Sequence, residues 1–458
     1  MVDGMTLGLT HARMLAMLQE RPDANPDASS DYPNSISGAI IRCIWDGEEA
    51  VAVGADRTVD TKVGALLDLI ELRSERARGR QARHSMEENV TLVLGHVDDD
   101  THREAVDALA TLRAAYIGPG RIRLVIEDEA GDLIDWEAGP TDFSQSESAA
   151  KWLELMSAVD GGPPELVTDL LTRVGHPALR AYPMLSQWPM WSLRLEGLIV
   201  GKIDAVKGVL DVGKPGRIGG ISRQRAAWQS THDIDEPIVV SAETLEESAE
   251  ALRLFADAWT GSATGDEPEI QDEHALESRI LRGDAAVRIE DGGRVLELIR
   301  EDRVVNWGSQ FPTKWGDSAS NVRHYLDALL RDSATPWALE LKVDGPGAIG
   351  RYYRHGIAQA VLYRHFIRTA TPLHPWFAQQ DPPLDPTLCK AALVVPRFFD
   401  KQEKWRHRHS YLARLFDVEL IEVDRSAAYV RTNVVSTSAV DPSLPDDDLD
   451  IDLSAPAA

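Results

Sequence analysis

The sequence YLDALLRDSATPWALELKV, at residues 325–343, decides how the C-terminal third of this chain folds. Two apolar runs flank DSATP at residues 332–336, a segment of turn-forming residues. Runs of this kind joined by a short turn segment are typical of a β-hairpin. A two-residue turn at Ser333 and Ala334 sets a register in which Asp327 lies directly opposite Glu340.

Asp327, Glu340 and Lys342 are expected on one face of this hairpin. Directly opposed residues place their Cβ atoms about 5 Å apart, and strand alternation puts Lys342 on the face of Glu340. Two carboxylates this close raise each other's pKa unless a cation lies between them. Carboxylate oxygens, a backbone carbonyl and water suit a hard divalent ion such as Mg²⁺ or Mn²⁺. The trio predicts a metal site, although a salt bridge at a sheet edge would also bring these residues together.

A divalent ion at this place suits the hydrolysis of a phosphodiester. The ion would polarise the phosphate and lower the pKa of a bound water. Lys342 could orient that water or neutralise charge that builds on the phosphate. The chemistry that the trio favours is therefore metal-assisted cleavage of a nucleic acid.

The surroundings of the trio resemble the core of PD-(D/E)xK nucleases. Residues 356–363, GIAQAVLY, resemble the Q-x-x-x-Y helix of the RecB-type branch, with Gln359 and Tyr363 on one helix face. Upstream, EHALESRIL at residues 273–281 resembles the opening helix of that fold, and QFP at 310–312 fits its first hairpin. A strand at 391–396 and a helix at 405–416 complete the expected order. Leu326 departs from the family, because it stands where the motif has proline.

The resemblance implies a restriction-endonuclease-like mixed sheet flanked by helices over residues 271–432. It also implies a deoxyribonuclease that depends on Mg²⁺ or Mn²⁺. The implied metal ligands are Asp327, Glu340, Leu341 through its carbonyl, and Glu277. The implied catalytic residues are Asp327, Glu340, Lys342, Gln359 and Tyr363.

The chain ahead of this region divides into further segments. We expect a flexible leader over residues 1–33, an N-terminal α+β domain over 34–145 and a mixed α/β middle region over 146–259. A linker is expected over 260–270, where TGSATGDEP combines small and charged residues without apolar periodicity. Residues 433–458 contain DDDLDID and are expected to form an acidic disordered tail.

The distribution of charge is compatible with DNA as the substrate. The net charge is −26, but residues 340–416 contain 12 Lys or Arg against 6 Asp or Glu. Phosphate contacts usually come from such basic residues. The candidates for contacting DNA near the 405–416 helix are Lys401, Lys404, Arg406 and Arg408. A protein partner could dock on the N-terminal region or on the acidic tail.

The composition indicates a globular protein outside membranes. Hydrophobic residues make up 43% and charged residues 27%, and no apolar run approaches the roughly 20 residues that span a bilayer. Two cysteines, Cys43 and Cys389, lie in different segments, which argues against a disulfide framework and favours a cytoplasmic protein.

The sequence therefore predicts a nuclease that hydrolyses DNA, with prokaryotic defence and DNA repair as compatible roles. The alternative is a catalytically inactive nuclease-fold scaffold or a nucleic-acid-binding or interaction protein. That alternative predicts no binding of a divalent ion.

Overall fold

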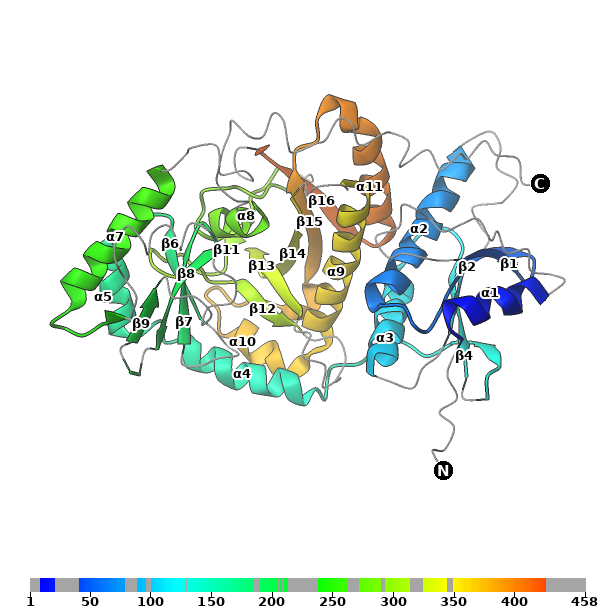
Figure 1. Ribbon diagram of the computed structural model, residues 1–458, viewed down its shortest axis with the longest axis horizontal. Coiled ribbons are helices and arrows are strands. Elements are labelled where there is room, and N and C mark those ends of the chain that lie inside the picture. The colour runs from blue at the N-terminus through cyan, green and yellow to red at the C-terminus, as the bar shows by residue number, and fades with distance from the viewer. Residues whose placement is uncertain are drawn as a thin grey trace.

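The computed structural model describes residues 9–20, 41–78, 89–95, 100–128, 130–183, 190–204, 206–207, 209–212, 238–261, 272–289, 293–313, 324–343 and 349–425. Within these ranges the strands form three sheets, with helices packed beside them (Figure 1). The chain is a mixed α/β protein, as the sequence predicts.

The C-terminal sheet contains the predicted hairpin. Its strands are β11 (Glu297–Leu298), β12 (Ser309–Thr313), β13 (His324–Asp332), β14 (Thr335–Leu341), β15 (Lys390–Pro396) and β16 (Val418–Val423). Their order is β11-β13-β14-β15-β16, and β12 also pairs with β13. β13 and β14 are antiparallel, whereas β14, β15 and β16 are parallel. The prediction of a mixed sheet at this place is confirmed.

Helices cover both faces of this sheet. Helix α8 (Asp272–Leu281) packs on one face, while α9 (Ile349–Thr369) and α11 (Glu403–Leu415) lie on the other. Alternation along β14 divides its side chains between the two cores: Leu339 packs with α8, and Ala338 packs with α9. Shorter helical turns lie between these elements: η2 (Thr371–Leu373), α10 (His374–Ala378), η3 (Pro386–Leu388) and η4 (Asp400–Gln402).

The N-terminal sheet has a parallel centre. Its strands are β1 (Ile41–Trp45), β2 (Glu48–Val53), β3 (Val90–Leu94), β4 (Ile122–Glu127) and β5 (Leu133–Asp135), in that order. β2, β3 and β4 run parallel and are joined through α2 (Val59–Arg78) and α3 (Asp100–Ala115). Parallel strands need such helical crossovers, so this unit has an α/β arrangement where an α+β one was expected.

Helix α1 (His11–Glu20) lies inside the segment that was expected to be a flexible leader. Met14 and Leu18 are fully buried against the N-terminal sheet, beside Trp45. Ala55 N–H donates to the carbonyl of Leu9 at 2.8 Å, which ties the start of the described chain to the end of β2. The structure differs from the prediction over residues 9–20, because two well-spaced apolar side chains anchor this short helix.

Helices α2 and α3 lie between the N-terminal sheet and helix α9 of the C-terminal sheet (Figure 1). One continuous apolar core joins residues of all three helices, including Leu66, Leu109 and Ile357. The layers therefore follow the order sheet, helices, helices, sheet. The predicted N-terminal and C-terminal regions share a core in this arrangement.

Buried charges also cross this contact between α2, α9 and α11. The guanidinium of Arg354 on α9 pairs with Asp68 and with Glu71 on α2, the latter at 2.6 Å. Arg408 on α11 lies 3.4 Å from Glu71. Burial acts to raise the pKa of Glu71, but the two guanidinium groups and His409 outweigh it and hold that pKa below its usual value.

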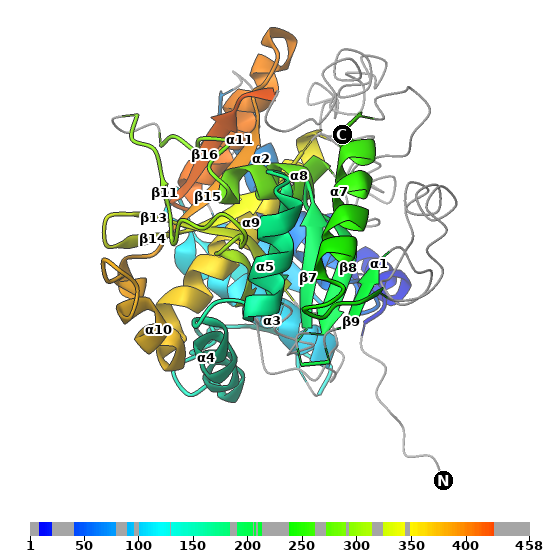
Figure 2. The same cartoon turned by 90° about the vertical axis from the view of Figure 1, so that its left-hand side faces the viewer.

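In its described residues, the middle region contains an antiparallel sheet and three helices. The elements are α4 (Glu147–Val159), α5 (Glu165–Val174), β6 (Leu179–Pro183), β7 (Met190–Leu195), β8 (Leu198–Asp204), β9 (Val209–Val212), β10 (Ile238–Val239) and α7 (Leu245–Gly261). Helices α5 and α7 pack together and share a core with β6 and β7 (Figure 2). Helix α4 instead contributes Ala149 and Met156 to the core around α9.

Two of the predicted segments lie outside the described residues. These are most of the linker, at residues 262–270, and the acidic tail at 433–458. Across the described ranges, no helix combines the length and the apolar character that crossing a bilayer requires. Cys43 and Cys389 are both buried, and neither forms a disulfide.

Candidate metal centre

The hairpin of β13 and β14 has the register that its sequence predicts. Leu329 faces Ala338, Ala328 faces Leu339, and the strands are joined by a two-residue turn at Ser333, whose φ is 56°. The paired residues end at Ala328 and Leu339, and Asp327 and Glu340 are the next residues on the two strands, at the open end of the hairpin. The carboxylate of Asp327 accepts a hydrogen bond of 2.8 Å from the N–H of Leu341, which orients it toward β14.

Three carboxylates converge at this end of the sheet. Glu273, Asp327 and Glu340 each offer an oxygen, and these oxygens all lie within 4.8 Å of one another. Lys342 Nζ lies 2.5 Å from Glu340 Oε1 and 3.0 Å from Glu273 Oε1. The site thus gathers residues from α8, β13, β14 and the residue just after β14.

The electrostatics of the site favour neutralisation by a cation. Burial raises the pKa of Asp327 well above its usual value, and the charge of Glu340 raises it further. Burial also raises the pKa of Glu340, although Lys342 opposes this shift. The charge of the Lys342 ammonium group therefore does not compensate the negative charges of the buried carboxylates around it.

The environment of one oxygen, Glu340 Oε2, indicates whether these residues fit a metal ion. Glu340 is 2% exposed, and its Oε2 has no hydrogen-bond partner among the residues that the structure describes. A buried carboxylate oxygen without a partner is costly, and a bound ion would remove that cost. Oxygen donors of this kind suit the hard cations Mg²⁺, Mn²⁺ and Ca²⁺. The donor set fits a divalent ion.

Helix α8 supplies a different carboxylate from the one that the sequence singles out. Glu277 is buried beside the site and contacts the hydroxyl of Ser309 and His274 Nδ1. Glu273, four residues earlier, is the member of the carboxylate group. Residues four apart share a helix face, so the sequence holds the signal for Glu273 but does not distinguish it from Glu277. The roles of Glu277 and of the carbonyl of Leu341 stay predictions.

Helix α9 packs against the site through a glycine. A Cβ on Gly356 would lie 3.0 Å from Lys342 Cγ, 3.5 Å from Glu340 Cγ and 2.7 Å from Leu393 Cδ1. The absence of a side chain therefore allows the helix to approach the strand where Glu340 and Lys342 lie.

Gln359 and Tyr363 lie one and two turns further along α9. Their side chains are hydrogen-bonded to each other, and burial raises the pKa of Tyr363, with added contributions from Glu340 and Asp327. Gln359 Oε1 is buried and has no hydrogen-bond partner within the described part of the chain. The predicted pair thus lies together, beside the carboxylates.

The predicted DNA-contacting residues do not share one environment. Lys401, Lys404 and Arg406 are exposed, and Arg406 pairs with Glu422. Arg408 is only 7% exposed, because it is buried beside Glu71 and lies over the ring of Trp405. This burial does not favour Arg408 as a contact to DNA.

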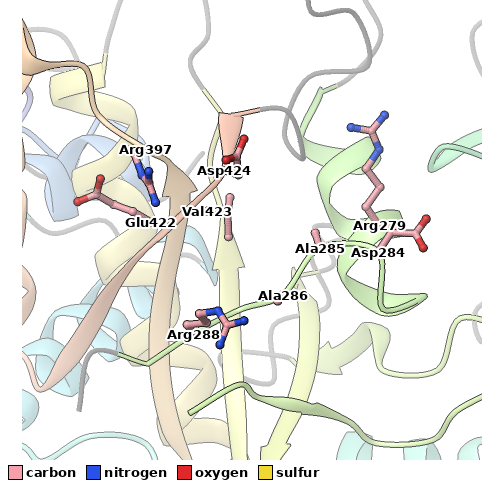
Figure 3. A pocket seen from close by; sticks show the side chains of 9 residues that line it. All are labelled: Arg279, Asp284, Ala285, Ala286, Arg288, Arg397, Glu422, Val423 and Asp424. Atoms are coloured by element: carbon pink, nitrogen blue, oxygen red, sulfur yellow. The ribbon is translucent and has the colours of Figure 1, made fainter. Parts of the chain in front are cut away.

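A pocket of about 450 Å³ lies at the edge of the sheet where β15 and β16 end (Figure 3). β14 runs parallel to these strands, so Lys342 lies at the same edge. The exposed side chains of Arg288, in the segment between α8 and β11, and of Arg397, directly after β15, line the pocket. The full lining is Arg279, Asp284, Ala285, Ala286, Arg288, Arg397, Glu422, Val423 and Asp424. Arg282 pairs with Asp284, and Arg406 pairs with Glu422, so arginines outside the pocket neutralise two of its acids.

Comparison of the chain with protein-family models, with curated proteins and with solved structures gave no match. The geometry of the site therefore carries the functional argument.

Proposed function

We propose that this protein is a metal-dependent nuclease that hydrolyses phosphodiester bonds of DNA, with a restriction-endonuclease-like C-terminal fold. One observation carries the proposal: three carboxylate oxygens lie within 4.8 Å of one another, and a buried lysine contacts two of the three groups. The orphaned Oε2 of Glu340 supports it, because an ion would provide the missing partner. Prokaryotic defence and DNA repair are both compatible with this activity.

Glu273, Asp327 and Glu340 would hold the ion, which is Mg²⁺ or Mn²⁺ in this proposal. When bound, it would supply Lewis-acid stabilisation of the phosphate and a more acidic water. The carboxylates would fix its position, and Lys342 would orient the attacking water and oppose the negative charge on the phosphate. Gln359 and Tyr363 would support Glu340 and Lys342 from the side of α9.

The test is cleavage of linear duplex, circular duplex and single-stranded DNA, beside RNA of the same sequence, by the purified protein with Mg²⁺ or Mn²⁺. We expect cleavage that stops in EDTA and falls by about 10²–10³-fold in Glu340→Gln and in Lys342→Met. Glu297→Gln, an exposed residue on β11, serves as the matched control and should cut like the wild type.

The proposal is wrong if the wild-type protein cuts none of these substrates and shows no binding of Mn²⁺ in calorimetry. That result would favour the alternative, in which Lys342 forms a structural ion pair within an inactive nuclease-like scaffold.

The pocket at the sheet edge supports a path for the DNA backbone beyond the carboxylates. Arg288→Gln and Arg397→Gln are each expected to weaken DNA binding and to reduce its salt dependence by about one unit of slope. The measurement is the logarithm of affinity against the logarithm of salt concentration, without metal, in a Glu340→Gln background that prevents cleavage. Arg173→Gln, an exposed residue of the middle region, should leave the slope unchanged. An unchanged slope in both pocket variants would exclude this path.

A further inference from the structure

The turn between β7 and β8 of the middle region packs on helix α8, which carries Glu273. Glu196 and Gly197 form this turn, with φ angles of 47° and 77°. The flanking residues Leu195 and Leu198 are paired, so the turn has two residues. Positive φ at both positions is the mark of a tight hairpin turn that favours glycine.

Glu196 makes two ion pairs with α8 and the residue that follows it. Its carboxylate lies 3.1 Å from Arg279 Nε and 2.9 Å from an Arg282 terminal nitrogen. Glu196 is 7% exposed and Arg282 is similarly buried. Pairs withdrawn from water are held strongly, because removing one partner leaves an uncompensated buried charge.

Gly197 brings the turn against the backbone of α8. A Cβ at this position would lie 2.0 Å from the carbonyl oxygen of His274 and 2.4 Å from its carbonyl carbon. No side chain fits in that space. The contacted residue, His274, directly follows Glu273. The β7–β8 turn therefore packs against the first helical turn of α8, which carries the Glu273 carboxylate.

Further polar contacts hold the same helix along its length. Asn306 donates to Tyr182 Oη of β6 at 2.6 Å and to the carbonyl of Ser278 on α8 at 3.3 Å. Glu277 contacts Ser309 at the start of β12. Contacts that involve β6 of the middle region and β12 of the C-terminal sheet thus fix both the position of α8 and its rotation about its own axis.

We propose that the β7–β8 turn positions the metal centre, with Glu196 as a positioning residue that holds α8 so that Glu273 reaches Asp327 and Glu340. The inference rests on the proposed function, because it concerns the same ion. It follows that metal affinity depends on the docking of the middle region, whose described residues contribute no ligand to the carboxylate group.

Binding of Mn²⁺ alone to the full chain, measured by calorimetry, tests this inference without any substrate. Glu196→Gln is expected to weaken Mn²⁺ binding by about 10-fold, since residues that orient metal ligands typically contribute 10–100-fold to affinity. Glu196→Asp, which keeps the charge, should recover part of the loss. Arg279→Gln keeps the Arg282 pair and should give a smaller loss in a folded protein.

A double variant separates positioning from a general loss of structure. Glu273→Gln removes the ligand that the turn positions, so adding Glu196→Gln to it should cause no further loss of affinity. Glu246→Gln, whose carboxylate pairs with Arg173 on the exposed side of the middle region, is the matched control and should bind like the wild type. Thermal unfolding of each variant reports whether it is folded.

The outcomes distinguish the two proposals. If Glu196→Gln and Arg279→Gln bind Mn²⁺ like the wild type, or if the losses at 196 and 273 are additive, the positioning role is wrong and the metal centre stands. If the wild type binds no Mn²⁺, the proposal of a metal centre and the proposal of a positioning role are both wrong.

Discussion

Replacing Asp327 with asparagine is expected to abolish cleavage and, in the absence of metal, to raise the thermal stability of the protein. Cleavage should fall by about 10³-fold, since a ligand charge is lost. Asparagine retains an oxygen that can accept the hydrogen bond from Leu341 N–H. It also removes a carboxyl whose ionisation is opposed by burial and by Glu340.

The sign of the stability effect follows from the raised pKa. The folded-state pKa of Asp327 lies above its unfolded value of about 3.9, so the folded protein binds more protons. The free energy of unfolding therefore decreases as pH rises from about 4 to the folded-state pKa. At higher pH it stays at this lower value. Asparagine does not titrate, so its advantage over aspartate should be greater at pH 8 than at pH 5.

Thermal unfolding in EDTA at pH 5 and pH 8 measures this difference, with a gain on the order of 2–5 °C expected at pH 8. Asp332→Asn, on the same strand and paired with Arg294 near the surface, is the control and should show no such gain. If Asp327→Asn lowers stability in EDTA at both pH values, the carboxylate serves a structural ion pair and the metal centre loses its main support.

Glu71→Gln is expected to destabilise the protein by about 1–3 kcal/mol, because Arg354 and Arg408 lose the carboxylate that they share, although Arg354 keeps its pair with Asp68. The pKa of Glu71 is lowered in the folded protein. Its contribution is therefore present above the unfolded value of about 4.3 and is lost as pH falls through the folded-state pKa. The difference in the free energy of unfolding between Glu71→Gln and the wild type should therefore be smaller at acidic pH.

Urea unfolding at pH 7 and at pH 4, followed by tryptophan fluorescence, gives this comparison. Glu403→Gln removes an exposed carboxylate that pairs with Arg406 and His407, and should cost less than about 0.5 kcal/mol. Equal stability of Glu71→Gln and wild type at pH 7 would mean that apolar packing alone holds α2 on α9.

The hairpin could be predicted because local rules determine it. A two-residue turn fixes which residues face each other, so the opposition of Asp327 and Glu340 follows from the positions of Ser333 and Ala334. Lys342 then follows from strand alternation. Gln359 and Tyr363 could be predicted as neighbours because four residues make about one helical turn.

The choice of Glu273 over Glu277 could not be predicted in the same way. Both lie on one face of α8, and the selection depends on where the helix lies relative to the sheet. That placement is set by Glu196 and Gly197, more than seventy residues earlier in the chain. Sequence periodicity describes which residues share a face but not how far a helix slides along its partner.

The burial of Arg408 and the packing of α1 have the same origin. The sequence predicts a helix at 405–416 with basic side chains, and one of these, Arg408, is covered by Glu71 of a distant helix. Met14 and Leu18 are too few to indicate a packed helix until the face of the N-terminal sheet is available to bury them. Tertiary contacts of large sequence separation decide both cases.

The order of layers has a consequence for how the protein is made. Helices α2 and α3 are complete at Ala115, but the helix that covers them begins only at Ile349. A ribosome needs on the order of 10–50 s to add the intervening residues at typical rates of synthesis. During that time Leu66 and Leu109 have no partner from α9, so the emerging chain exposes an apolar surface that chaperones recognise. Newly synthesised chains are thus most vulnerable to aggregation before their last third has emerged.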